Sequence, residues 1–192
     1  MVNHLIAEAK TILRASPYDA AHALDHHQRV WNNAKWIIKH EKLEVDDEAL
    51  YIAAWWHDVD KGSSNDPRLI AVLRRHRVPQ SRIDTILAIM NQHSFEDEQT
   101  TIEGKILFDA DKLEYVSRER WSKFLTALQK DPAKQDTLKA YQIALAERIV
   151  PVYHRLYFDA TKQRFAKDYQ QYRAWHLSQF KFPLPPLPPH LS

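Results

Sequence analysis

Apolar residues recur along most of the chain at spacings of three and four positions, which is the periodicity of amphipathic helices. No segment shows sustained alternation of apolar and polar residues, the pattern of a half-buried strand. The low glycine content also favours helices over β structure, because the 192 residues contain only two glycines. Turn-rich β architectures need glycine where φ is positive. The pattern therefore predicts an all-α protein.

Start and stop signals divide this pattern into helices of ordinary length. The predicted helices cover residues 4–15, 25–40, 46–58, 66–76, 79–93, 101–115 and 117–130, followed by two long helices between 134 and 180 that separate near 151–159. Asp25 and Ser117 are expected to cap the helices that they begin. The helix from Asp46 is apolar on almost every side, so we expect it to be the buried central helix.

The helical pattern ends at a proline-rich tail, where five of the chain's ten prolines lie between positions 183 and 189. We expect one helical bundle over residues 1–182, with a C-terminal helical extension, and a tail over 183–192 in polyproline II or disordered conformation. The tail matches the PxxP pattern that SH3-type domains bind. A tail that lies on the surface or in solvent fits the same composition.

The overall composition is that of a soluble globular protein, with 44% hydrophobic and 27% charged residues. A net charge of +2 gives no electrostatic argument for nucleic acid as a partner. No stretch approaches the ~20 apolar residues that span a bilayer, and the N-terminus lacks the apolar run of a signal peptide. We therefore expect a cytoplasmic protein with neither a membrane nor a nucleic-acid partner, and the sequence leaves its oligomeric state open.

The chain has no cysteine, which excludes disulfides, thiolate zinc sites and cysteine nucleophiles. Any metal chemistry must then use the 11 histidines and the carboxylates. His57 and Asp58 are adjacent at the end of an apolar helix, where a charged carboxylate is costly unless something pairs with it. A divalent cation accepts imidazole and carboxylate together. The pair also fits a helix end whose histidine caps carbonyl groups and whose aspartate begins a turn.

Two further motifs accompany this pair. Residues 26–30 read His-His-Gln-Arg-Val, residues 57–62 read His-Asp-Val-Asp-Lys-Gly, and residues 110–113 read Ala-Asp-Lys-Leu. Their order and spacing resemble the HD superfamily of metal-dependent phosphohydrolases. The similarity extends through Asn-Gln-His-Ser-Phe at 91–95 and Glu-Gly-Lys-Ile-Leu at 103–107, which recur in its small stand-alone bacterial members. The resemblance covers residues 19–115 and implies an HD-type helical fold.

The resemblance also implies a site for one divalent cation, Mn²⁺, Mg²⁺ or Fe²⁺, with about two positions left for water and a phosphoryl oxygen. The metal ligands that it implies are His26, His57, Asp58 and Asp111. His26 is preferred to His27 because it stands three residues before the arginine of its motif, and Asp111 is preferred to Asp109 because it follows the motif alanine. The nucleophile would be a metal-activated water, whose proton Asp58 could accept.

Two more residues are candidates for the chemistry. Lys61 could direct its ammonium at a phosphoryl oxygen, or it could be a solvated lysine beside a loop glycine. His93 could contact phosphate or join a second metal, or it could cap carbonyl groups at the end of its helix. Some branches of the superfamily carry a glutamate where Lys61 stands, so the resemblance does not imply their nucleotide-monophosphatase mechanism.

The expected function is hydrolysis of a phosphoester or phosphoanhydride in a small, nucleotide-like substrate. Small stand-alone relatives are associated with nucleotide pyrophosphatase activity, so a nucleoside triphosphate is the first substrate to consider, by analogy alone. One alternative is a phosphodiesterase for cyclic or signalling nucleotides. The other is a domain without activity that binds a nucleotide or a partner and uses the metal structurally.

Overall fold

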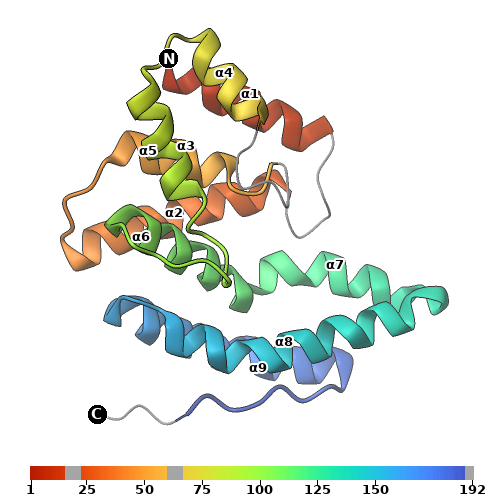
Figure 1. Cartoon of the computed structure of the whole chain (residues 1–192). Coiled ribbons are helices and arrows are strands. Elements are labelled where there is room, and N and C mark those ends of the chain that lie inside the picture. Colours follow the sequence, from red (N-terminus) through yellow and green to blue (C-terminus); the bar gives the residue numbers. More distant parts are fainter. Residues whose placement is uncertain (16–22, 60–66, 189–192) are drawn as a thin grey trace. The chain divides into compact units, whose positions relative to one another are not determined.

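The computed structural model describes residues 1–15, 23–59 and 67–188 (Figure 1). Throughout these ranges the regular elements are helices, so the all-α prediction is confirmed. The α-helices are α1 (Val2–Ala15), α2 (Leu24–Glu41), α3 (Asp47–Trp56), α4 (Pro67–Arg75), α5 (Gln80–Met90), α6 (Ile102–Lys112), α7 (Arg118–Lys130), α8 (Gln135–Arg155) and α9 (Asp159–Phe180). Two short 3₁₀ helices, η1 (Leu113–Val116) and η2 (Pro132–Lys134), lie between them.

Contacts divide the chain into two compact units, residues 1–111 and residues 112–192. The boundary follows Asp111, so all four expected metal ligands belong to the first unit. The division expected from the sequence, with one domain up to residue 182, stays a prediction.

The first unit is built around α3, which packs against α1, α2 and α5 (Figure 1). Seven of its ten residues are buried, and none of these seven is more than 1% exposed. Asp46 caps its N-terminus by accepting a hydrogen bond from the Ala49 amide, and Trp56 donates its indole N–H to the carbonyl of Leu5 on α1. The prediction of a buried central helix is confirmed.

Some helix boundaries differ from the sequence-based expectations. Asp25 does not cap α2, because Ala23 holds the N-cap position and Asp25 lies in the first turn, where its charge still complements the helix dipole. The helix predicted to reach Tyr115 tightens into η1 after Lys112. Ser117 caps α7 through the Arg120 amide, as expected.

Pro151 does not separate the two long C-terminal helices, although proline removes one helical hydrogen bond. Helix α8 continues through Pro151 to Arg155, and the break falls at residues 156–158. Ile149 and Val152 flank the proline and are fully buried, so packing keeps the helix continuous across it.

The described part of the proline-rich tail packs along α9 within the second unit. The Tyr169 hydroxyl donates to the Pro185 carbonyl, and the Nε of Arg173 donates to the Leu184 carbonyl over 2.8 Å. His176 adds a third contact, because its Nδ1 lies 3.0 Å from the Phe182 carbonyl. These three side chains share one helix face, and Leu184 is only 2% exposed. Residues 183–188 therefore lie on the surface of the second unit and are held against α9, with Leu184 buried and Pro183 and Pro186 exposed.

Shortening Leu184 to alanine is expected to lower the free energy of unfolding by about 2–4 kcal/mol, because it leaves a cavity beneath the tail. Guanidinium denaturation followed by tryptophan fluorescence measures the change. Pro186→Ala is the matched control, since Pro186 is exposed and its substitution should change stability by less than about 0.5 kcal/mol. Equal effects of the two substitutions would show that the tail does not contribute to the packed core.

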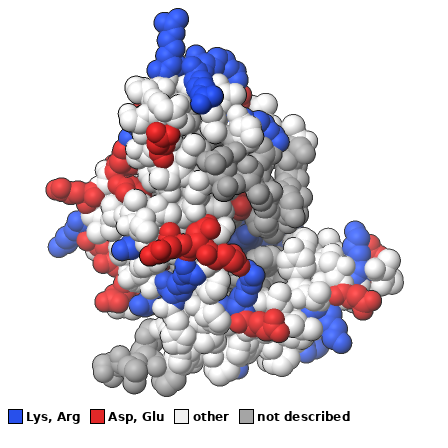
Figure 2. Space-filling model, viewed as in Figure 1, with Lys and Arg blue, Asp and Glu red and all other residues white. Residues whose placement is uncertain are grey.

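Both signs of charge occur on the face shown in Figure 2, where a band of acidic side chains has basic side chains directly beside it. The expected absence of a nucleic-acid partner stays a prediction. Among the described residues, no helix combines the length and the apolar character needed to cross a membrane.

Candidate metal centre

Three helices of the first unit bring His26, His57, Asp58 and Asp111 to one place. His26 lies in the first turn of α2, His57 is the C-cap of α3, Asp58 follows it in the turn, and Asp111 lies near the end of α6. Adjacent side chains inside a helix diverge by about 100°, but the helix end frees His57 and Asp58 to approach the same point. All four side chains are buried, with exposed fractions between 1% and 7%.

The ligand atoms of these residues converge. His26, His57 and Asp58 each present one such atom, and the three atoms lie within 4.8 Å of one another. The Nε2 atoms of His26 and His57 are 3.3 Å apart, and they lie 3.7 and 3.5 Å from Oδ2 of Asp58. Oδ1 of Asp111 is 3.4 Å from the Nε2 of His26 and 3.9 Å from the Nε2 of His57. Ligand atoms about 2.0–2.2 Å from one ion are separated by about 3.0–3.6 Å. Three of these spacings lie in that range and the other two, 3.7 and 3.9 Å, slightly exceed it, so the four groups lie close enough to converge on one cation.

The orientation of His57 shows which of its nitrogens is available. Its Nδ1 lies 3.0 Å from the Ala54 carbonyl, and because a carbonyl only accepts, Nδ1 carries the proton. Nε2 is therefore a bare lone pair that faces another imidazole nitrogen and two carboxylates. A proton shared among these groups, or a cation bound between them, pairs with the nitrogen lone pair and the carboxylate charges.

The protonation states match those of a metal site. Burial lowers the pKa of His57 to about 3, although the neighbouring Asp58 opposes that shift. For Asp58, burial raises the pKa, but the neighbouring His57, His26 and His93 outweigh burial and lower it well below its usual range. At neutral pH the pair is a neutral imidazole beside a carboxylate, which is the form in which both bind metal.

His27 packs against His57 and contacts the same backbone carbonyl. It is fully buried, and its Nδ1 lies 3.3 Å from the same Ala54 carbonyl that His57 contacts. Its ring lies 4.7 Å from that of His57 and stacks on Trp55 at 6.2 Å. A ligand imidazole usually donates its second N–H to such a carbonyl, which fixes the ring. The sequence motifs assign no role to His27, and its contact with the shared Ala54 carbonyl reveals one.

A family model described as the HD domain matches residues 23–116, the stretch that supplies all four of these side chains. Residues 23–116 are an HD domain. Members of this family are typically metal-dependent phosphohydrolases. No curated protein matches the sequence.

Two solved structures are similar to the whole chain. The Lin1889 protein from Listeria innocua is 20% identical, with a TM-score of 0.67, over 93% of this chain and 96% of its own. A protein from Lactobacillus plantarum is 21% identical, with a TM-score of 0.67, over 93% of this chain and 95% of its own. At this level of identity the likeness shows a common fold and nothing about activity.

The HD domain places His93 beside the candidate metal ligands. The Nε2 of His93 lies 3.6 Å from Oδ1 of Asp58, whereas the other oxygen of Asp58 faces His26 and His57. The Nδ1 of His93 lies 2.7 Å from the Met90 carbonyl, so it carries the proton and leaves Nε2 toward Asp58. His93 therefore contacts the Met90 carbonyl and also faces Asp58, so the two alternatives expected for it occur together. Lys61 lies outside the described residues, so its role stays a prediction.

Asn33 joins α2 to α6 next to Asp111, a role that the sequence analysis did not predict. Its side chain is buried, and Nδ2 donates to the carbonyl of Ala110 over 3.1 Å. This bond joins α2 to α6 at the residue before Asp111. Asn33 follows His26 by seven residues, which is two helical turns, and this spacing was the available signal.

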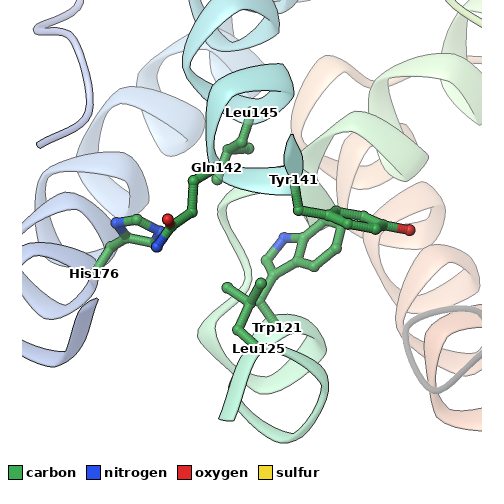
Figure 3. Close-up of a pocket in the computed structure, with 6 residues that line it drawn as sticks. All are labelled: Trp121, Leu125, Tyr141, Gln142, Leu145 and His176. Carbon is green, nitrogen blue, oxygen red and sulfur yellow. The ribbon is translucent and has the colours of Figure 1, made fainter. Parts of the chain in front are cut away.

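The second unit contains a small cavity of different chemistry (Figure 3). Its lining residues are Trp121 and Leu125 on α7, Tyr141, Gln142 and Leu145 on α8, and His176 on α9. Its volume, about 20 Å³, has room for about one water molecule and is far below the roughly 300–1,000 Å³ of typical ligand sites. With one imidazole and no carboxylate in its lining, this cavity lacks the donor set that the HD motifs bring together.

Proposed function

We propose that this protein is a metal-dependent phosphohydrolase that cleaves a phosphoester or phosphoanhydride in a small, nucleotide-like substrate. The observation that carries the proposal is the convergence of two imidazole nitrogens and two carboxylates, from α2, α3 and α6, around one buried point. This donor set of mixed nitrogen and oxygen atoms suits Mn²⁺, Fe²⁺ or Mg²⁺. The typical activity of HD-domain proteins supports the same function.

Each of the site residues has its own role in the proposed reaction. His26, His57, Asp58 and Asp111 would hold the cation, which when bound lowers the pKa of water and withdraws charge from phosphorus. Asp58 is ionised at neutral pH, so it can accept a proton from the attacking water. His93 is 19% exposed and approaches Asp58 through its other oxygen, so it can contact substrate while it orients that carboxylate. Lys61 would supply positive charge to a phosphoryl oxygen.

A substrate panel on protein with measured metal content tests the proposal. The protein is analysed for metals as purified, stripped with a chelator and reloaded with Mn²⁺, Mg²⁺ or Fe²⁺. It is then assayed with nucleoside triphosphates, nucleoside monophosphates and cyclic nucleotides. Nucleoside triphosphates are tested first. We expect metal-dependent release of phosphate or pyrophosphate. Cleavage of the cyclic diesters alone indicates a phosphodiesterase, and binding without turnover for every metal indicates a non-catalytic domain.

Replacing His93 with alanine is expected to lower kcat by about 100-fold while metal affinity stays within a few-fold of wild type. The reason is that His93 approaches Asp58 through the oxygen that faces away from His26 and His57. Steady-state kinetics and metal titration measure the two quantities. His40→Ala on the exposed side of α2 is the control and should change neither quantity. Normal turnover in the His93 variant would remove this residue from the mechanism.

A further inference from the structure

Gln92 occupies the junction between α5 and α6 and is only 8% exposed. Its Oε1 accepts hydrogen bonds from the amides of Thr100 and Thr101 over 2.7 and 3.0 Å, and lies 3.3 Å from the Thr101 hydroxyl. Its Nε2 donates to the Ala88 carbonyl over 2.8 Å. One amide therefore ties the last turn of α5 to the two residues that precede α6.

The backbone of Gln92 is hydrogen-bonded as well as its side chain. Its carbonyl lies 2.8 Å from the Nε2 of Gln99, which is also 3.1 Å from the Ser94 carbonyl and 2.8 Å from the Asp97 carbonyl. The Ser94 amide in turn donates to the Asp97 carboxylate over 3.2 Å. The residues on both sides of His93 are thereby fixed, although His93 lies outside any regular helix.

Gly104 leaves the space that the Gln92 side chain fills. A Cβ atom at Gly104 would lie 2.2 Å from Oε1, 2.7 Å from Cδ and 2.9 Å from Cβ of Gln92. Contacts this short do not occur, so any larger residue at position 104 must displace the Gln92 amide. Gly104 is helical and its φ is not positive, so close approach rather than backbone conformation requires glycine here.

We propose that Gln92 is the positioning residue for His93, holding the imidazole so that Nε2 faces Asp58. His93 follows Gln92 directly. Its Nδ1 lies against the Met90 carbonyl, and its Nε2 lies 3.5 Å from the Ser94 hydroxyl and faces Asp58. Without the Gln92 amide the segment that carries His93 loses its bonds to Ala88, Thr100 and Thr101, and His93 can move away from Asp58, which lies at 3.6 Å. The competing possibility is that Gln92 only caps α6 and acts on the site through Asp111. The catalytic consequence of the proposal rests on the proposed function, whereas its structural consequence does not.

The structural consequence is tested by NMR with ¹⁵N-labelled histidine, on metal-free and Mg²⁺-loaded protein. In the wild type we expect His93 as a single tautomer protonated on Nδ1. Gln92→Leu and Gly104→Ala should both shift His93 toward averaged tautomers while the signals of His26 and His57 are kept. Gln80→Leu, at an exposed glutamine that begins α5, is the matched control. An unchanged His93 tautomer in both variants overturns the proposal.

The catalytic consequence is tested by a double-mutant cycle with the Mn²⁺-loaded enzyme. Gln92→Leu should lower kcat roughly tenfold in the wild type and leave kcat unchanged in the His93→Ala background, because the two residues act as one unit. An undiminished loss in that background supports action through Asp111 and overturns the proposal. Gln92→Glu keeps the three bonds to Thr100 and Thr101 and loses only the one to Ala88, so it should fold if Gln92→Leu does not, and recover part of the loss. If no wild-type turnover is found, the proposed function fails while the NMR result still decides the role of Gln92.

Discussion

The Asp58→Ala protein is expected to lose its metal and at least about 1,000-fold of its hydrolytic rate, a loss equivalent to about 4 kcal/mol of transition-state stabilisation. Asp58 lies next to three histidines, and both of its oxygens face them. Its removal takes a ligand and a proton acceptor together. The helical circular-dichroism signal should stay, because Asp58 lies in a turn after α3 and not within a helix.

Asp25→Ala is the matched control for that experiment. Asp25 stands beside His26 on α2 but is exposed, so its loss removes a charge near the site without removing a ligand. We expect normal metal content and normal turnover in this variant. Metal analysis of both purified variants, followed by rate measurements at saturating substrate, separates the outcomes. If Asp58→Ala hydrolyses substrate at the wild-type rate, the assignment of this centre is wrong.

The metal-free protein is expected to lose stability steeply as the pH falls from about 6.5 to 5. Burial lowers the pKa of His57 to about 3, and burial together with His57 and His26 lowers the pKa of His27 well below its usual value. The unfolded chain titrates these groups near 6.5, so in this window it binds protons that the folded protein does not. Stability therefore rises with pH there, by up to about 1.4 kcal/mol per pH unit for each histidine. Asp58, whose pKa is lowered, stays ionised in both states above about pH 5 and adds no slope.

Urea denaturation of chelator-treated protein at pH 7, 6 and 5 measures this dependence. His57→Phe should reduce the slope by about 1.4 kcal/mol per pH unit, whatever its effect on the absolute stability. Saturating metal should raise stability at pH 7 and widen the gap to pH 5, because protons and metal compete for the same nitrogens. A free energy of unfolding that does not change between pH 6.5 and 5 would show that these histidines are not buried in neutral form.

The sequence by itself determined the helical class and most helix positions, because apolar spacing reports which faces are buried in any helical fold. It also named His26, His57, Asp58 and Asp111, because the order of the three motifs that contain them can be read without knowledge of the structure. Their assignment as metal ligands stays a proposal, although the structure brings the four side chains together.

Other features depended on contacts between segments far apart in the chain, which a local pattern does not contain. The cap of α2 at Ala23, the continuation of α8 through Pro151 and the burial of Leu184 against α9 all follow from tertiary packing. The same holds for the Ala54 carbonyl that His27 and His57 share, and for the Gln92 amide that joins α5 to α6. Sequence spacing shows which groups are available for chemistry. Only the fold decides which nitrogen carries a proton and what holds each ring in place.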